Sequence, residues 1–254
     1  MVAKVLICIP TYNEIENIES ILKRVLSVRQ PILDENKNVN EIHVLVIDDA
    51  SPDGTSARVK ELQFPKVDIL DRTEKAGLGP AYIAGFAWGK SHGFTHVVEM
   101  DADGSHQPEE LHRLLAKITE ADLILGTRWM PGGRVENWPF RRKLLSLMGT
   151  KYASKALKLP YKDLTGGYRV LSSDLLEKVD LSQIQSKGYG FQIEMVMRSA
   201  DIRARIVQVP ITFIDRTLGT SKMNGAIAIE ALGQITKWGF ERRISAVRRS
   251  LMHN

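Results

Sequence analysis

Two aspartates, Asp101 and Asp103, stand one residue apart directly after the apolar run HVVEM. On a leaving strand, side chains at i and i+2 point to the same side, so these carboxylates could grip one divalent cation. Hard oxygen ligands suit Mg²⁺ or Mn²⁺, which keep waters and accept substrate phosphates as further ligands. D-x-D also occurs by chance in acidic loops. The metal interpretation therefore depends on what else the fold brings to the same place.

Arginines and one lysine in loop-like segments complement this pair. Arg recognises phosphate oxygens through paired hydrogen bonds, whereas Lys acts more as a point charge. Metal-holding carboxylates with arginines nearby can stabilise a departing diphosphate. Taken singly, most of the 35 basic residues are better explained as solvated surface charges. The candidates are Arg128, Arg141, Arg142, Arg169, Arg216 and Lys222.

The elements that position these residues are predicted from the alternating strand and helix patterns in the first half of the sequence. These patterns predict an α/β fold with a mostly parallel, Rossmann-like sheet and helices on both faces. Ligands bind outside the carboxyl ends of such strands, so residues 10–14, 48–49, 101–103 and 127–128 should meet at one edge. The predicted strands are 4–10, 41–51, 67–72, 96–103 and 121–128, and the predicted helices are 17–28, 56–62, 81–93 and 108–118.

The second half has a less regular pattern. It predicts a basic helix over 141–157, a strand over 205–216 and a long C-terminal helix. Packing against the sheet is the commoner explanation for the apolar face of that last helix, and lying on a membrane surface is the alternative. The face comprises Ile227, Ile229, Leu232, Ile235, Trp238, Ile244, Val247 and Leu251.

Charge and composition narrow the function classes. The net charge is +5, and the segment from residue 237 onward carries five Lys/Arg against one Glu. Such a surface suits nucleic acid, anionic lipid or phosphorylated small molecules. The acidic strand ends argue against nucleic acid, and we expect no nucleic-acid partner. The single cysteine, Cys8, excludes an internal disulfide and is predicted to be a buried hydrophobe.

Several common signatures are missing. No apolar stretch approaches the roughly 18–20 residues that cross a bilayer, and the start lacks a signal-peptide pattern. There is no P-loop and no G-x-G-x-x-G after the first strand, which argues against P-loop enzymes and dehydrogenases. The six histidines show neither zinc-ligand spacing nor a Ser-His-Asp arrangement. His106 lies near D-A-D, but a structural role is favoured for it.

Eight segments, in chain order, resemble the family-two glycosyltransferases. More narrowly, they are similar to dolichyl-phosphate (polyprenyl-phosphate) mannosyltransferases of the short form, without transmembrane helices. Together they run from residue 5 to about 225. The segments are PTYNE (10–14), VIDDASPDGT (46–55), KAGLGPAY (75–82), MDADGSHQP (100–108), GTR (126–128), TGGYR (165–169), GYGFQIEM (188–195) and DRTLGTSK (215–222).

The resemblance implies an A-type glycosyltransferase fold over residues 1–225, followed by a basic amphipathic helical tail over 226–254. It also implies site residues, of which Asp101, Asp103 and Arg128 would be catalytic. The nucleotide sugar would contact Pro10, Tyr12, Glu14, Ile47, Asp49, Asp101, Ala102, Asp103, Arg128, Arg216 and Lys222. The acceptor phosphate would contact Arg128, Arg142 and Ser146, and the metal Asp101, Asp103 and Ser105.

The implied reaction moves mannose from GDP-mannose to a polyprenyl or dolichyl monophosphate with inversion, using Mg²⁺ or Mn²⁺. The acceptor phosphate is already anionic, so the protein needs positioning and electrostatics more than a strong base. A UDP-glucose-dependent enzyme acting on lipid phosphate is the closest alternative. A catalytically inactive subunit is disfavoured by the intact Asp101, Asp103, Arg128 and Lys222.

The lipid acceptor implies a membrane location. We expect peripheral attachment at the cytoplasmic face, directly or through a membrane-embedded partner protein. The basic tail would contribute about 1 kcal/mol per Lys or Arg near an anionic surface.

Overall fold

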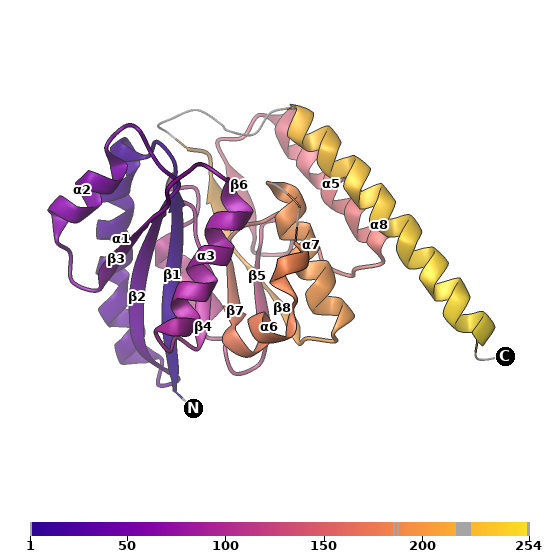
Figure 1. Cartoon of the computed structure of the whole chain (residues 1–254), viewed down its shortest axis with the longest axis horizontal. Helices are drawn as coiled ribbons and strands as arrows, with labels where there is room; N and C mark the ends of the chain where they lie inside the picture. Colours follow the sequence, from indigo (N-terminus) through magenta and orange to yellow (C-terminus); the bar gives the residue numbers. More distant parts are fainter. Residues whose placement is uncertain (1, 185, 187, 217–224, 253–254) are drawn as a thin grey trace.

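A mixed sheet lies at the centre of the protein (Figure 1). The computed structural model describes residues 2–184, 186, 188–216 and 225–252, and within them this sheet has seven strands in the order β3-β2-β1-β4-β7-β5-β8. Only β7 runs antiparallel to its neighbours, so the predicted mostly parallel sheet is confirmed. The strands are β1 (Ala3–Thr11), β2 (Val39–Asp48), β3 (Val67–Asp71), β4 (His96–Glu99), β5 (Leu123–Thr127), β7 (Arg169–Ser172) and β8 (Ile206–Pro210).

Helices cover both faces of the sheet, because its strands are apolar on both sides. On β1, Val5 and Ile7 pack with α1 (Ile15–Glu35) and α4 (Leu111–Leu115). Leu6 and Cys8 point the other way and pack with α3 (Leu78–Ser91) and α7 (Tyr189–Asp201). Cys8 is a buried core residue, as expected. The shorter elements are α2 (Thr55–Leu62), η1 (Pro108–Glu110), α6 (Ser173–Lys178) and η2 (Leu181–Gln183).

The structure corrects several predicted boundaries. The strand expected over 96–103 ends at Glu99, so both aspartates lie in the turn that follows it. The strand expected over 205–216 is two strands, because β9 (Thr212–Ile214) leaves the main sheet and pairs with β6 (Arg134–Glu136). Strand β7 was not predicted. It is only four residues long, and the side chain of its last residue, Ser172, caps α6 by accepting a hydrogen bond from the Leu175 N–H.

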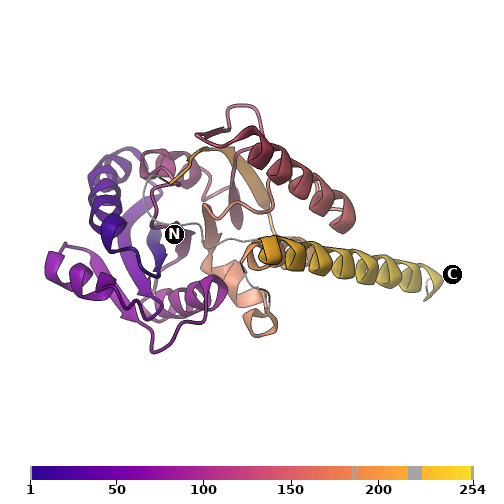
Figure 2. The same cartoon turned by 90° about the horizontal axis from the view of Figure 1, so that it is seen from above.

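Two helices lie outside the sandwich, α5 (Phe140–Leu157) and α8 (Gly225–Met252). The predicted packing of the C-terminal helix on the sheet is wrong, since α8 contacts α5 and α7 instead. Ile235 is buried there, and Arg242 forms an ion pair with Asp201 at 2.7 Å. Figures 1 and 2 show α8 continuing beyond the rest of the protein.

The apolar residues expected on one face of α8 divide between two environments. Ile235 and Trp238 pack inward, whereas Leu232 and Ile244 are exposed. The side chains of Ile227, Ile229, Val247 and Leu251 lie outside the described set. Among the helices that the structure describes, none combines the length and apolar character needed to cross a bilayer.

We expect Gly85→Ala to destabilise the fold by about 1–3 kcal/mol through overpacking. A Cβ on this α3 residue would lie 2.5 Å from Ile47 Cδ1 and 2.9 Å from Cys8 Sγ. Gly149→Ala on α5 is the matched control, since a Cβ there meets nothing within 4 Å. Its better helix propensity should stabilise the protein by up to about 1 kcal/mol. Urea unfolding of both variants measures this, and equal effects would contradict the described packing.

Candidate active site

The carboxyl ends of β1, β4 and β5 meet at a cavity of about 220 Å³. This is the edge at which a parallel sheet is expected to bind its ligand. Eight of the residues expected to form the site line this one cavity, although they lie far apart in the sequence. They are Pro10, Glu14, Asp101, Ala102, Asp103, Arg128, Arg142 and Arg216.

The turn after β4 presents its two aspartates differently. The side chain of Asp101 is 35% exposed, whereas that of Asp103 is 8% exposed. The Asp101 N–H donates to His106 Nδ1 at 3.0 Å, and the Ser105 N–H donates to Asp103 Oδ1 at 3.0 Å. Gly104, with φ of +75°, supplies the left-handed conformation that reverses the chain. The turn therefore holds both carboxylates against the cavity.

The two carboxyls also differ electrostatically. Burial raises the pKa of Asp101, and the neighbouring charge of Asp103 adds to this, against the opposing effect of His106. Burial acts on Asp103 in the same direction. There, hydrogen bonding from Ser105 and the Arg216 guanidinium, 3.1 Å away, lower its pKa overall. A divalent cation bound between them would favour the ionised form of both.

The residues at this turn fit a divalent metal. Asp101 and Asp103 offer hard oxygen donors, and the lack of a side chain at Gly167 leaves space in front of them. A Cβ there would lie 3.8 Å from Asp101 Oδ1. The described residues contain no group of three or more His, Cys, Asp or Glu placed to hold a metal. Phosphate oxygens and water would have to complete the coordination, as Mg²⁺ prefers.

Ser105 and His106 belong to the same turn, and of the two only His106 lines the cavity. Ser105 is buried and is not among the cavity-lining residues, so its expected role as a metal ligand stays a prediction. The His106 ring stacks on Tyr168 and meets Phe213 edge-on. Burial lowers the pKa of His106. A neutral imidazole that accepts the Asp101 N–H supports the turn, which agrees with the structural role favoured for it.

Arg128 is held by a buried carboxylate that the sequence did not single out. Its Nε and Nη2 donate to the two oxygens of Asp163 at 2.7 and 2.8 Å, and Nη2 also donates to Thr165 Oγ1 at 2.8 Å. Asp163 in turn accepts from the N–H groups of Thr165 and Gly166. The only available signal was an Asp two residues before Thr-Gly-Gly, the pattern of an Asx turn.

Arg142 approaches the cavity from the first turn of α5. Its Nη1 donates to both carboxylate oxygens of Asp215 at 2.8 Å, and its guanidinium lies 4.1 Å from the Trp138 ring centroid. The Arg128 guanidinium lies 5.6 Å from the same ring. Trp138 therefore contacts two cations that line the same cavity as its own ring. Ser146, one turn further along α5, is not among the lining residues.

Three further residues predicted to bind the donor, Tyr12, Ile47 and Asp49, are not among the residues that line the cavity. The Tyr12 ring carries Lys75 Nζ 3.7 Å above its centroid. The Ile47 side chain is fully buried against α3, away from the cavity. The Asp49 carboxylate binds Arg72 and accepts the N–H groups of Ala76 and Gly77.

The contacts of Ile47 and Asp49 show that both shape the site's surroundings. Their direct contact with a nucleoside stays a prediction. Lys222 lies outside the described residues.

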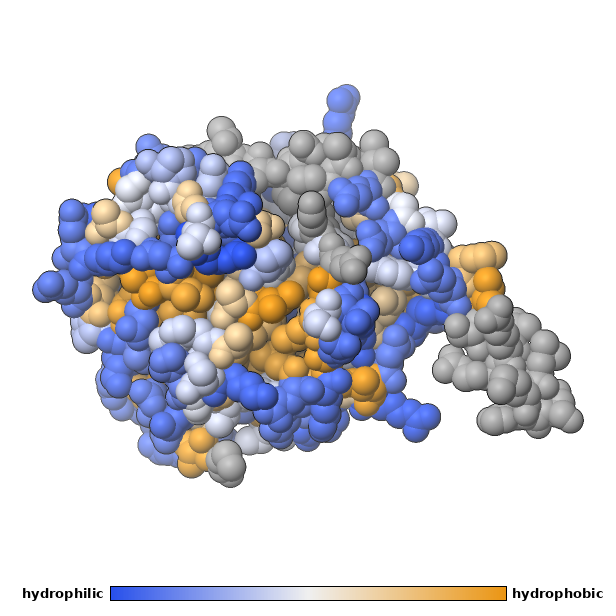
Figure 3. Space-filling model, viewed as in Figure 1, coloured by the Kyte–Doolittle hydropathy of each residue, from blue (hydrophilic) through white to orange (hydrophobic). Residues whose placement is uncertain are grey.

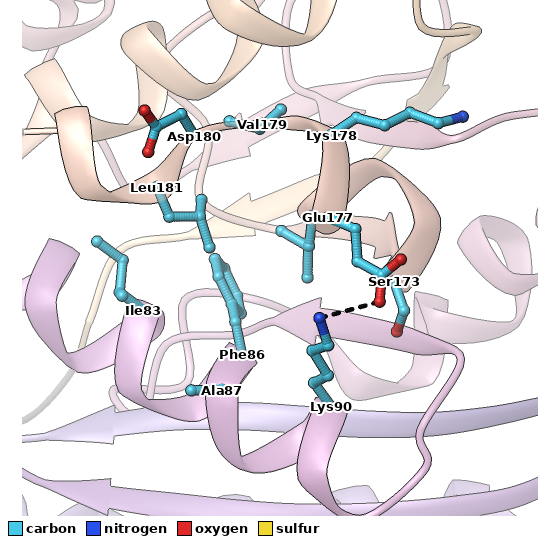
Figure 4. A pocket seen from close by; sticks show the side chains of 11 residues that line it. Ile83, Phe86, Ala87, Lys90, Ser173, Glu177, Lys178, Val179, Asp180 and Leu181 are labelled. Atoms are coloured by element: carbon cyan, nitrogen blue, oxygen red, sulfur yellow. Dashed lines mark ion pairs between the residues drawn. The ribbon is translucent and has the colours of Figure 1, made fainter.

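A larger cavity of about 480 Å³ lies between α3 and α6 (Figure 4). Apolar residues gather in this region of the face shown in Figure 3. Phe86 and Leu181 line the cavity, and the Lys90–Glu177 ion pair, at 3.0 Å, lies at its rim. It contains neither paired carboxylates nor clustered arginines, so the smaller cavity is the candidate active site.

A sequence profile described as glycosyl transferase family 2 matches residues 6–180. The chain belongs to this family. It is 49% identical over 250 residues to an undecaprenyl-phosphate mannosyltransferase of Micrococcus luteus, covering 98% of this chain and 99% of that protein. It is 45% identical over 249 residues to a polyprenol monophosphomannose synthase of Mycolicibacterium smegmatis, covering 96% and 90% respectively.

Solved structures of the same fold include glucosyl-3-phosphoglycerate synthase of Mycobacterium tuberculosis in complex with Mn²⁺, UDP-glucose and phosphoglyceric acid. The TM-score is 0.70 at 18% identity, covering 93% of this chain and 80% of that one. A likeness at this identity concerns the fold alone. It confirms the predicted A-type glycosyltransferase fold.

We expect Asp163→Asn to destabilise the protein by roughly 3–5 kcal/mol, because it removes the buried carboxylate that accepts two hydrogen bonds from the Arg128 guanidinium. Asp122→Asn is the matched control. Asp122, which is 29% exposed, pairs at 2.8 Å with Arg205, which is 61% exposed, so the loss should stay below about 1 kcal/mol. Denaturant unfolding of both variants compares the two losses. Similar values would show that Asp163 is not what holds Arg128.

Proposed function

We propose that this glycosyltransferase transfers mannose from GDP-mannose to a polyprenyl monophosphate, with inversion at the anomeric carbon. The observation that carries the proposal is one cavity lined both by Asp101 and Asp103 and by three arginines, Arg128, Arg142 and Arg216. A nucleotide sugar and a lipid phosphate both require that combination of charges. The names of the two nearly full-length relatives support mannose and a polyprenyl phosphate.

The proposed roles follow from position in the cavity. Asp101 and Asp103 hold Mg²⁺ or Mn²⁺, which when bound neutralises charge on the donor diphosphate. Arg216, already beside Asp103, binds a donor phosphate oxygen. Arg128 and Arg142, which both lie beside Trp138, orient the acceptor phosphate. Rigidly held cations of this kind lower the barrier because they need little reorganisation.

The displacement step does not require the protein to supply a general base. An anionic oxygen of the acceptor phosphate attacks the anomeric carbon as the bond to GDP breaks, so one displacement converts an α-linked donor into a β-linked product. No proton has to leave the nucleophile. This agrees with a cavity whose one lining histidine, His106, is buried and already accepts a backbone N–H.

We further propose that the protein binds the membrane surface through α5. Apolar side chains lie exposed along this helix, including Phe140 at 77%, Leu145 at 67% and Met148 at 59%. They start beside Arg142, which lines the cavity, so a lipid phosphate bound there would have its chain next to an apolar surface. Exposed Arg141 and Lys151 on the same helix suit an anionic leaflet.

The first experiment measures transfer of labelled sugar from GDP-mannose to polyprenyl phosphate with Mg²⁺ or Mn²⁺, beside UDP-glucose as the competing donor. We expect metal-dependent product from GDP-mannose. Asp103→Asn should lose roughly 10²–10³-fold in rate, whereas Asp34→Asn, an exposed residue on α1, should not. Product from UDP-glucose alone would favour the glucosyltransferase alternative. Transfer from neither donor would overturn the proposal.

The second experiment tests the membrane surface. We expect Leu145→Ser with Met148→Ser to weaken binding to anionic vesicles by at least about tenfold, because burying one such side chain is worth about 1.5–3 kcal/mol. Ile202→Ser removes an exposed apolar side chain at the end of α7 and is the control. Vesicle sedimentation provides the measurement. Equal binding by all variants would exclude α5 as the docking surface.

A further inference from the structure

Gln192 presents a buried amide that forms no hydrogen bond of normal geometry within the described chain. It stands near the start of α7, where its backbone carbonyl accepts a hydrogen bond from Arg169 Nη1 at 2.7 Å. Its side chain is only 2% exposed, yet neither Nε2 nor Oε1 makes a hydrogen bond to any described residue. Buried polar groups are normally paired. An apolar residue at this position would avoid the cost of an unpaired amide, so the amide calls for a functional explanation.

This amide faces the candidate active site. Gln192 lines the same cavity as Asp101 and Asp103. A Cβ built on Gly167 would lie 3.7 Å from Gln192 Nε2 and 3.8 Å from Asp101 Oδ1. The amide nitrogen and the carboxylate oxygen therefore border the same small space, which Gly167 keeps open.

The chemistry of the amide differs from that of its neighbours. The cations and the two aspartates of the cavity suit phosphates and a metal, which are wholly charged groups. An amide is neutral and both donates and accepts hydrogen bonds. A hydroxyl group also does both, whereas an ionised phosphate only accepts. The cavity, at about 220 Å³, falls below the roughly 300–1,000 Å³ of sites that enclose a drug-sized ligand, so it suits the sugar end of the donor.

Glu99 interacts with the amide from within the protein. Its carboxyl is fully buried, and burial raises the pKa of Glu99 to about 7, against the weaker effect of the Gln192 amide, which lowers it. The two side chains nevertheless form no hydrogen bond of normal geometry with each other. The amide can therefore still form hydrogen bonds with a ligand hydroxyl.

We propose that Gln192 determines donor specificity by hydrogen-bonding one hydroxyl of the transferred sugar, beside the diphosphate held at Asp101 and Asp103. The inference rests on the proposed nucleotide-sugar-dependent function. A site built to bind a hydroxyl rejects the analogue that lacks it, because its own buried polar groups are then left unpaired. Gln192 thus selects between sugars of the same size that differ in their hydroxyls.

The test compares GDP-mannose with its monodeoxy analogues in the wild-type protein and in Gln192→Met. The wild type should discriminate against one of these analogues by roughly 10- to 100-fold in kcat/KM. In Gln192→Met that ratio should fall to near one, while the ratios for the other positions stay unchanged. Comparing the same two donors in both proteins cancels their intrinsic reactivity. A uniform loss on every donor would mean that Gln192 has only a structural role, and would overturn the inference.

Gln107→Met is the matched control. The Gln107 amide is satisfied within the protein, because its Nε2 donates to the carbonyls of Gly104 and Ser105 and its Oε1 accepts from Arg24. Loss of this side chain should change the rate for all donors alike and leave every ratio intact. A changed ratio in this variant would show that selectivity depends on the general shape of the turn, which contradicts the inference.

Donor binding separates this inference from the proposed function. By calorimetry with Mn²⁺, Gln192→Met should bind GDP within about twofold of the wild type but bind GDP-mannose roughly 5- to 50-fold more weakly. Intact GDP binding also shows that the variant is folded, and Gln192→Glu serves as a second variant of the same size. Equal weakening for both ligands would overturn the inference. Failure of the wild type to transfer mannose would instead count against the proposed function.

Discussion

The rest of the site depends on the hydrogen bonds that the fully buried Arg169 guanidinium donates to three backbone carbonyls. Its nitrogens donate to the backbone carbonyls of Leu164, Gly166 and Gln192 at 2.7–2.8 Å. One side chain at the start of β7 thereby joins the loop before that strand to the start of α7. A buried charge is tolerated only when it is fully hydrogen-bonded, so the loop and helix have little freedom to separate. The cavity walls on this side are fixed as a result.

Each arginine that lines the cavity is held in place by an ion pair with a carboxylate. Arg128 pairs with Asp163, Arg142 with Asp215 and Arg216 with Asp103. A carboxylate beside each guanidinium fixes its position without ligand. Donors that are already oriented lose little entropy when a phosphate arrives. The carboxylates of Asp163 and Asp215 also reduce the net positive charge at the cavity, so that, of these three arginines, Asp101 and Asp103 face only the remaining charge of Arg216 when a metal arrives.

The fold could be predicted from the sequence because its strands are long, apolar and regularly interrupted by helices. The strand-end rule also placed Asp101, Asp103 and Arg128 near one another. The same reasoning from strand ends could not identify the roles of Asp163 and Gln192. The partner of Asp163 lies 35 residues away in sequence, and the GYGFQIEM segment looks like any half-buried helix until its amide is seen to form no hydrogen bond of normal geometry within the described chain. Contacts between distant segments carry no local signal.

The geometry of α5 connects the two ends of the proposed acceptor. A helix places residues three or four apart on one face, and successive residues turn by about 100°. Arg142 lies toward the side of the helix that buries Thr150 and Ala153, whereas Leu145 and Met148 point outward. A molecule with a charged head and an apolar chain could therefore contact the cavity and the exposed stripe together. Neither a water-soluble phosphate nor an uncharged lipid would use both surfaces, which is why the combination favours a lipid phosphate.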